Sequence, residues 1–280
     1  MEDKTITAET IARFEAWLRA EEKSAGTVEK YLRDTRAFAR WLDGRVPTKE
    51  TAAAWKEHLL REGYAPATVN SMLAALNCLF RFAGMDVRTR FVRIQRSSFR
   101  EKSRELTQAE FRRLVETADS AGKQRLSLLL ETVCATGIRV SEVKYITVAA
   151  AQTGKASISL KGKTRTILLP EKLCRKLLKY AGKQKIASGE IFLTGSGKSL
   201  SRGQIWAEMK RLCAKAEVEP TKVFPHNLRH LFAATFYRIY KDVVRLADIL
   251  GHSSVDTTRI YLVSTGEAHQ RMLEQMRLIS

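Results

Sequence analysis

The chain has 280 residues, 44% of them hydrophobic, and a formal net charge of +19 at pH 7. This length suits one large domain or two ordinary ones, and the sequence holds no apolar run of about 18 residues that could span a membrane. The excess of Lys and Arg favours a polyanionic partner such as nucleic acid, with a solvated basic surface as the plain alternative.

The positive charge is unevenly placed. Residues 151–200 hold 11 basic and 2 acidic side chains, whereas residues 1–50 hold 10 of each. The N-terminus has no apolar stretch suited to a secretory signal. The four cysteines lie far apart in apolar contexts, which predicts reduced core thiols and a cytoplasmic protein rather than disulfides or metal ligands.

The first third of the chain is patterned as helices. Four segments place apolar side chains on one helical face, and several of them begin after a Thr or Ser cap or end at a Gly. These segments are residues 7–22, 24–44, 48–63 and 65–84. Four helices joined by short turns predict an all-α bundle over residues 1–92. Residues 88–106 are basic, contain no Gly or Pro and predict an extended linker, which we bound at 93–105.

The remaining sequence mixes helices with a hairpin. Thr107 and Glu110 form a capping-box pattern, and an apolar helix is expected to end at Gly137. Alternation predicts strands at 156–160 and 165–170 around a Lys161-Gly162-Lys163 turn, and a third short strand at 189–195. Further helices are expected at about 201–217, 225–240, 242–250 and 254–262. The fold expected is mainly α, with an α+β domain over 106–265 that carries a small antiparallel sheet, and a helical tail over 266–280.

Two histidines raise the question of a metal site. His226 and His230 are spaced as two ligands on one helical face. However, Asn227 stands where the zinc-protease motif needs Glu, no third ligand is near, and the intervening Arg229 would repel a dication. We therefore predict no metal.

The arginines point to phosphate instead. Pro225 suits the first turn of a helix, which would place His226 and Arg229 on the same face. Arg can bind two phosphate oxygens at once and His can transfer a proton. Arg139 lies where one helix ends and the next begins, and Glu142 could hold its side chain or cap the helix.

Taken together, these motifs resemble the tyrosine recombinase (phage integrase) family. The resemblance covers nearly the whole chain and is strongest from 130 to 261. The matching elements, in chain order, are Arg139 in "TGIRVSE", Lys161 in "LKGK", His226 and Arg229 in "HNLR", His252 in "LGHSS", and Tyr261 in "TTRIY", nine residues after His252.

The resemblance implies a chemistry without a cofactor. Tyr261 would attack a DNA phosphodiester and form a 3′-phosphotyrosine, while Arg139 and Arg229 hold the non-bridging oxygens. A lysine would protonate the departing 5′-oxygen, and His226 and His252 would bind the phosphate or move protons. Lys161 matches the family's Lys-Gly pair, and Lys163 matches the family's distance to Arg165.

The resemblance also implies partners. Double-stranded DNA would lie between the helical domain and the catalytic domain, and a homo-tetramer would form on DNA by exchange of the C-terminal tail. Accessory DNA-bending proteins are a further partner class. The side chains expected to contact DNA are Arg81, Arg88, Arg90, Arg93, Arg96, Lys163 and Arg165.

Two alternatives stay open at this point. A DNA-binding regulator or architectural protein could keep this fold without cutting DNA, and a type IB topoisomerase would share the chemistry. The sequence gives neither the target site nor the choice among integration, excision, inversion and resolution.

Overall fold

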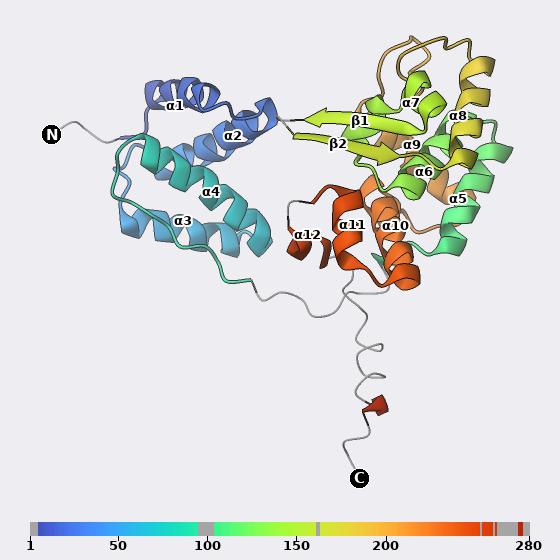
Figure 1. Ribbon diagram of the computed structural model, residues 1–280. Helices are drawn as coiled ribbons and strands as arrows, with labels where there is room; N and C mark the ends of the chain where they lie inside the picture. Colours follow the sequence, from blue (N-terminus) through green and yellow to red (C-terminus); the bar gives the residue numbers. More distant parts are fainter. Residues whose placement is uncertain are drawn as a thin grey trace. The chain divides into compact units, whose positions relative to one another are not determined.

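The computed structural model describes residues 5–94, 104–160, 163–252, 254–259, 261 and 274–276. The chain divides into two compact units, residues 1–96 and 97–280 (Figure 1). No helix in the described ranges is long and apolar enough to cross a membrane. All four cysteines are free thiols, and three of them are buried.

The first unit is a bundle of four helices, as predicted. They are α1 (Ala8–Ala20), α2 (Ala25–Leu42), α3 (Lys49–Arg61) and α4 (Pro66–Phe82). Thr7, Ser24 and Thr48 cap the first three with their side chains, each accepting a backbone N–H from the first turn. The apolar faces meet in one core, where Phe14, Phe38 and Phe80 are fully buried.

The segment after α4 is fastened to that helix. Asn77 exchanges two hydrogen bonds with the backbone of Thr89, both 2.9 Å long. Asn70 does the same with Val92, at 2.9 and 2.7 Å. Two helical turns between the asparagines span roughly 10.5 Å and three extended residues span roughly 10 Å, so the spacings match if the segment runs extended and antiparallel to α4.

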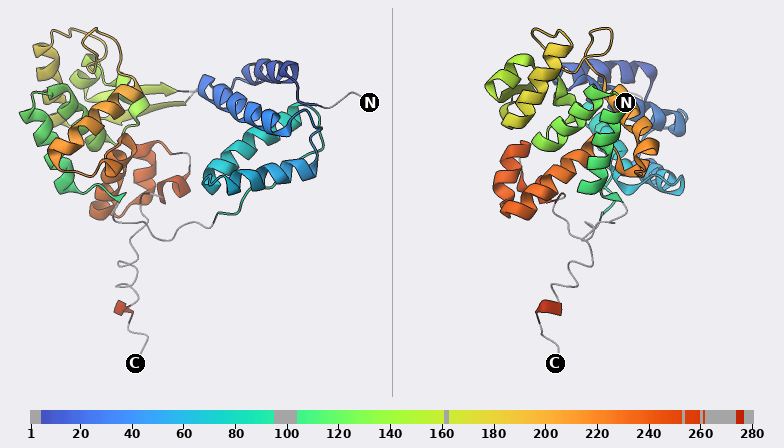
Figure 2. Two further views of the ribbon diagram at one scale, coloured as in Figure 1. Left: turned by 180° about the vertical axis from the view of Figure 1, so that it is seen from behind. Right: turned by 90° about the vertical axis from the view of Figure 1, so that its right-hand side faces the viewer.

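The second unit combines helices with one hairpin. Its elements are α5 (Gln108–Ser120), α6 (Gln124–Thr136), the 3₁₀ helix η2 (Val140–Tyr145), α7 (Val148–Thr153), β1 (Lys155–Leu160), β2 (Lys163–Leu168), α8 (Glu171–Lys183), α9 (Arg202–Ala216), the 3₁₀ helix η3 (Pro220–Lys222), α10 (Pro225–Tyr240), α11 (Val243–Leu250) and α12 (Val255–Arg259). Helices α10 and α11 lie side by side, as Figures 1 and 2 show. The mainly α fold with a small antiparallel sheet is confirmed.

The hairpin differs from the prediction in its turn. Leu160 pairs with Lys163, so Lys163 opens β2 and only residues 161–162 connect the strands. Ile158 pairs with Arg165 and Ala156 pairs with Ile167. Ala156, Ile158 and Ile167 are all buried, and paired residues in an antiparallel sheet share a face. Arg165 therefore belongs to the core-facing side of the hairpin.

The third strand expected at 189–195 is wrong. Glu190 and Leu193 form only isolated bridges, to Thr147 and Ser199. Thr147 is the N-cap of α7, so the segment that pairs with Glu190 becomes helical directly after this residue. The bridge therefore cannot extend into a strand pair. Ile191 and Phe192 are buried nonetheless, which accounts for the apolar run in the sequence.

Candidate active site

The end of α6 brings Arg139 to the site. Gly137 ends the helix with a left-handed backbone, φ 64°. A β-carbon there would lie 2.6 Å from the Phe232 ring and 2.9 Å from Leu250, so only Gly fits without movement. Arg139 then caps η2. Glu142 accepts the Arg139 backbone N–H at 2.8 Å and its guanidinium at 3.0 Å, so it both caps the helix and holds the side chain.

The Glu142 carboxylate is shared by two arginines. Its Oε2 also accepts from Arg165 Nη2 at 2.5 Å, and the residue is 1% exposed. Burial alone would raise the pKa of Glu142. The Arg139 backbone N–H and the two guanidinium groups outweigh burial and hold the pKa below its usual value.

Helix α10 supplies the second arginine. Pro225 occupies its first turn, which places His226 at an exposed position and Arg229 one turn later, 2% exposed. Arg229 Nη1 donates to the Gly137 carbonyl at 2.5 Å, and Nη2 donates to the Leu250 carbonyl at 2.8 Å. Burial and repulsion from Arg139 lower the pKa of Arg229, while its interaction with Tyr261 opposes this shift.

His252 follows the end of α11 and is held from both sides. Its Nε2 lies 2.8 Å from Arg229 Nη2, and its Nδ1 lies 2.7 Å from the Thr258 hydroxyl. Because guanidinium only donates, Nε2 must accept, so the proton is on Nδ1 and is donated to Thr258. Burial, followed by the charge of Arg229, lowers the pKa of His252 to about 4, which keeps the ring neutral at pH 7.

Tyr261 lies inside this group of side chains and is 4% exposed. Its ring centroid is 5.4 Å from that of His226, 5.5 Å from His230 and 5.7 Å from His252, with the last pair nearly parallel. Its backbone N–H donates to the Thr258 carbonyl at 2.9 Å. The positive charge of Arg229 therefore acts on the Tyr261 phenol, and three imidazole rings lie next to the Tyr261 ring.

The structure thus gathers five of the six residues expected to be catalytic: Arg139, His226, Arg229, His252 and Tyr261. Lys161 lies outside the described residues, as do Arg96 and the side chain of Lys163. Arg81, Arg88, Arg90 and Arg93 are exposed on the first unit.

Two further side chains belong to the site. Thr258 contacts both His252 and Tyr261 and was not among the residues expected from the sequence. Its place three residues before the tyrosine is the signal that could have identified it. The ring of His230, named above only as a possible metal ligand, also contacts Tyr261.

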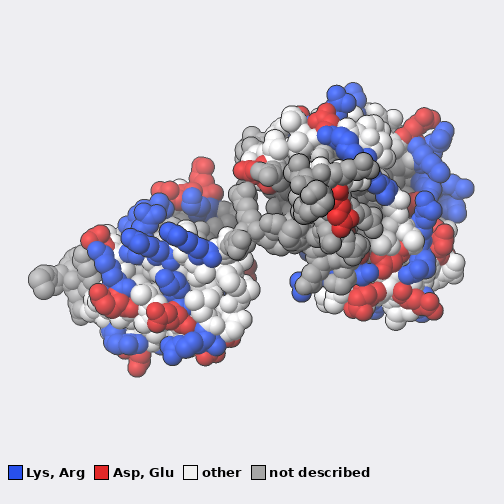
Figure 3. All heavy atoms as spheres, turned by 90° about the horizontal axis from the view of Figure 1, so that it is seen from below, with Lys and Arg blue, Asp and Glu red and all other residues white. Residues whose placement is uncertain are grey.

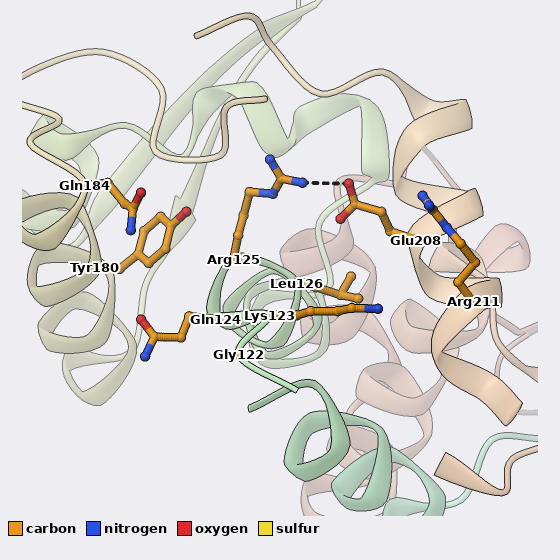
Figure 4. Close-up of a pocket in the computed structure, with 9 residues that line it drawn as sticks. All are labelled: Gly122, Lys123, Gln124, Arg125, Leu126, Tyr180, Gln184, Glu208 and Arg211. Carbon is orange, nitrogen blue, oxygen red and sulfur yellow. Dashed lines mark hydrogen bonds and ion pairs between the residues drawn. The ribbon is translucent and has the colours of Figure 1, made fainter. Parts of the chain in front are cut away.

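A separate pocket of about 420 Å³ lies at the opposite end of α6, between α8 and α9 (Figure 4). Arg125 spans it and is neutralised by Glu208 at 2.6 Å. Gly122 and Tyr180 also line this pocket, and none of the expected catalytic side chains does. Across the described ranges no three His, Cys, Asp or Glu side chains group as metal ligands would.

Comparison with protein families gives two matches. Residues 104–267 match the phage integrase family. Residues 11–85 match the N-terminal SAM-like domain of phage integrases. The first match alone covers more than half of the chain.

Individual relatives align along nearly the full length. The tyrosine recombinase XerA of Pyrococcus furiosus is 28% identical, over 100% of this chain and 98% of its own. The tyrosine recombinase XerD of Xanthomonas axonopodis pv. citri is 29% identical, over 88% of this chain and 89% of its own.

Solved structures share the fold. The Tn1549 transposon integrase in complex with transposon right end DNA superposes with a TM-score of 0.74 at 18% identity, covering 97% of this chain and 99% of its own. A lambda integrase tetramer bound to a Holliday junction gives 0.71 at 22% identity, covering 92% and 78%.

Proposed function

The chain belongs to the phage integrase family, and we propose that it is a site-specific DNA recombinase that cleaves and rejoins DNA through Tyr261. One observation carries the proposal at the level of residues. The Tyr261 side chain interacts electrostatically with the buried Arg229, and its ring lies 5.4 Å from that of His226 and 5.7 Å from that of His252. Arg139 and Arg229 bond neighbouring carbonyls at the end of α11, beside the same ring. A phosphodiester entering there would meet a nucleophile and fixed positive charge together.

Each residue has a role in the proposed reaction. The Tyr261 oxygen attacks phosphorus, a bond to the DNA 3′-phosphate forms, and the bond to the 5′-oxygen breaks. Arg139 and Arg229 stabilise the charge on the non-bridging oxygens. Lys161, with Lys163 as the alternative, protonates the departing 5′-oxygen. His226, exposed beside the phenol, is placed to take the phenol proton.

The covalent link makes the reaction reversible. A phosphotyrosine ester retains the free energy of the broken phosphodiester, so a 5′-hydroxyl from a second DNA can displace Tyr261 and restore a strand. The proposed reaction therefore draws on no ATP. The fixed guanidinium groups supply the charge that metal ions supply in many other phosphoryl-transfer enzymes.

The proposed partners are double-stranded DNA and further copies of the same chain. We propose a tetramer held by exchange of the tail, residues 266–280. A groove of about 350 Å³ on the second unit supports this, because apolar side chains of α5 and α10 line it. They include Phe111, Phe232, Phe236, Ile239 and Tyr240, of which the last two are more than half exposed. The tail offers Met272, Leu273, Met276 and Leu278 as a matching apolar set.

The domain boundaries and location are proposed on the same basis. The boundaries are those expected from the sequence: 1–92 for the DNA-binding bundle, 93–105 for the linker, 106–265 for the catalytic domain and 266–280 for the tail. A cytoplasmic location fits a DNA substrate and four free thiols. Accessory DNA-bending proteins have no support beyond the family resemblance.

A suicide substrate tests the activity. A duplex nicked close to the cleavage position loses the 5′-hydroxyl fragment after attack, so a cleaving enzyme is trapped covalently on DNA. We expect a denaturation-resistant adduct with the wild-type protein and none with Tyr261→Phe, which should still bind the same duplex. DNA binding by the wild type without any adduct would favour the DNA-binding regulator. Relaxation of supercoiled DNA without strand exchange would favour the topoisomerase.

A further inference from the structure

The C-terminal end of α11 organises three arginines. Its last carbonyl oxygens are consecutive, and each accepts from a different guanidinium. Ile249 accepts from Arg165 at 3.2 Å, Leu250 accepts from Arg229 at 2.8 Å, and Gly251 accepts from Arg139 at 3.4 Å. The free carbonyls at a helix C-terminus carry partial negative charge, so this end suits a cluster of cations.

Arg165 was expected to contact DNA, but its geometry is that of an internal side chain. It lies on the core-facing side of β2, opposite Ile158, and is 19% exposed. Nη2 is bonded to Glu142 and Nη1 is bonded to the Ile249 carbonyl. Its Nε is buried.

Gly251 explains how Arg165 reaches this place. A β-carbon on Gly251 would lie 2.5 Å from Arg165 Nη1 and 2.6 Å from its Cδ. The backbone of Gly251 is also left-handed, φ 62°. The glycine directly before His252 therefore leaves the space in which the Arg165 side chain crosses from β2 to Glu142.

The same contacts bear on Arg139. Glu142 Oε2 accepts from both the Arg139 backbone N–H and Arg165, and its Oε1 accepts from the Arg139 guanidinium. Arg139 and Arg165 share this one buried carboxylate, and both repel the nearby Arg229. Removing Arg165 would leave Glu142 with one cation fewer and would detach β2 from the end of α11.

We propose that Arg165 is a positioning residue of the recombinase site, which fixes Glu142 and the α11 C-terminus so that Arg139 and His252 are set before DNA binds. It acts through these groups and does not contact the scissile phosphate. This inference rests on the proposed function, because its main readout is DNA cleavage.

The test compares DNA binding with cleavage in Arg165→Gln. The slope of log K against log salt is negative, and loss of one phosphate contact would reduce its magnitude by about 0.9. We expect the slope and the affinity at one salt concentration to match the wild type, while single-turnover cleavage of the suicide substrate falls about tenfold to a hundredfold, as for other residues that orient a reacting group. Arg175→Gln on α8, 70% exposed and paired with Glu171, is the matched control and should change neither.

Two further variants distinguish a loss of positioning from a folding defect in Arg165→Gln. Arg165→Lys keeps the charge but cannot bond Glu142 and the Ile249 carbonyl with one planar group, so it should be nearly as impaired as Arg165→Gln. Gly251→Ala displaces Arg165 without altering it and should show the same split between binding and cleavage. Rescue by Arg165→Lys, a reduced salt slope in Arg165→Gln, or unchanged cleavage in Arg165→Gln would each overturn the inference. Absence of an adduct from the wild type would instead contradict the proposed function.

Discussion

His252 shows how single residues set the chemistry of this site. Its Nε2 accepts from Arg229 and its Nδ1 donates to Thr258, so one tautomer of the neutral ring satisfies both neighbours. A protonated ring could not accept from Arg229, and it would also face Arg139, Arg165 and His226. The protein therefore holds a histidine that resists protonation.

This resistance predicts a pH-dependent stability. The pKa of His252 is about 4 in the folded protein and near 6.5 when unfolded, so the unfolded chain binds more protons between these values. The melting temperature should thus fall as pH falls from 6.5 towards 4, and it should fall less in His252→Gln. Thermal unfolding of both proteins at pH 7 and pH 5 measures the difference. Equal slopes for the two proteins would contradict the assignment.

Thr258 predicts a difference between two conservative changes. Thr258→Ser keeps the hydroxyl that accepts from His252, whereas Thr258→Val keeps the shape and removes it. A lost hydrogen bond costs about 1 kcal/mol, so we expect Thr258→Val to slow cleavage about fivefold and Thr258→Ser to stay near the wild type. Single-turnover cleavage rates test this, with far-UV circular dichroism as the check on folding. Equal rates for the two variants would remove Thr258 from the site.

At the scale of elements, the segment after α4 is built by two asparagines. An amide side chain both donates and accepts, so Asn70 and Asn77 can each complete the hydrogen bonds of one backbone residue, Val92 and Thr89. Arg88 and Arg90 flank the buried Thr89 and are exposed. The asparagines thus fix where these arginines are displayed.

Hydrogen exchange tests this attachment. Asn77→Ala removes the partner of the Thr89 N–H, and we expect the protection of that amide to fall by about fivefold to tenfold, consistent with a hydrogen bond worth about 1 to 1.5 kcal/mol. The Val92 amide, bonded to Asn70, should change less. Thr68→Ala, at an exposed position of the same helix, is the control. Protection of Thr89 that is the same in all three proteins would disprove the role of Asn77.

Elements with a repeating apolar pattern could be predicted from the sequence. Elements that depend on contacts with a distant segment of the chain could not. The first four helices follow from apolar spacing and from Thr or Ser caps. The strand expected at 189–195 failed because burial of Ile191 and Phe192 does not require a ladder. The docking of Thr89 on α4 could not be read from the sequence, because it depends on side-chain hydrogen bonds between segments.

The candidate site divides in the same way. Arg139, Arg229, His252 and Tyr261 could be chosen from their motifs, since the chemistry requires those residue types. Their supports could not, because most are backbone carbonyls, at Gly137 and at the end of α11. Arg165 was expected to contact DNA, and only the strand register places it on the core-facing side.

At the scale of the whole molecule, positive charge is the main feature. Lys and Arg side chains lie on the surface of both units in Figure 3. The chain carries 49 of them against 30 Asp and Glu. Binding of such a protein to DNA should weaken steeply with salt, because each phosphate contact releases counterions.

The arginines of the first unit should carry part of this salt dependence. Replacing Arg88, Arg90 and Arg93 by Gln in one variant should reduce the magnitude of the slope of log K against log salt by about 2 to 3, at about 0.9 for each phosphate contact. Replacing Lys172, Lys179 and Lys183 on α8 removes the same charge and should leave the slope nearly unchanged. Titration of a labelled duplex at several salt concentrations measures both. Similar slopes for the two triple variants would contradict the predicted DNA contacts.

The chemical identity of the covalent link is the most direct test of Tyr261 as the nucleophile. Trypsin digestion of the adduct trapped on a suicide substrate should release the DNA end on a single peptide, residues 260–271, and fragmentation should place the phosphate on Tyr261. We expect a 3′-phosphate ester at that oxygen. A nucleotide attached to any other side chain, or attached through its 5′-phosphate, would contradict it.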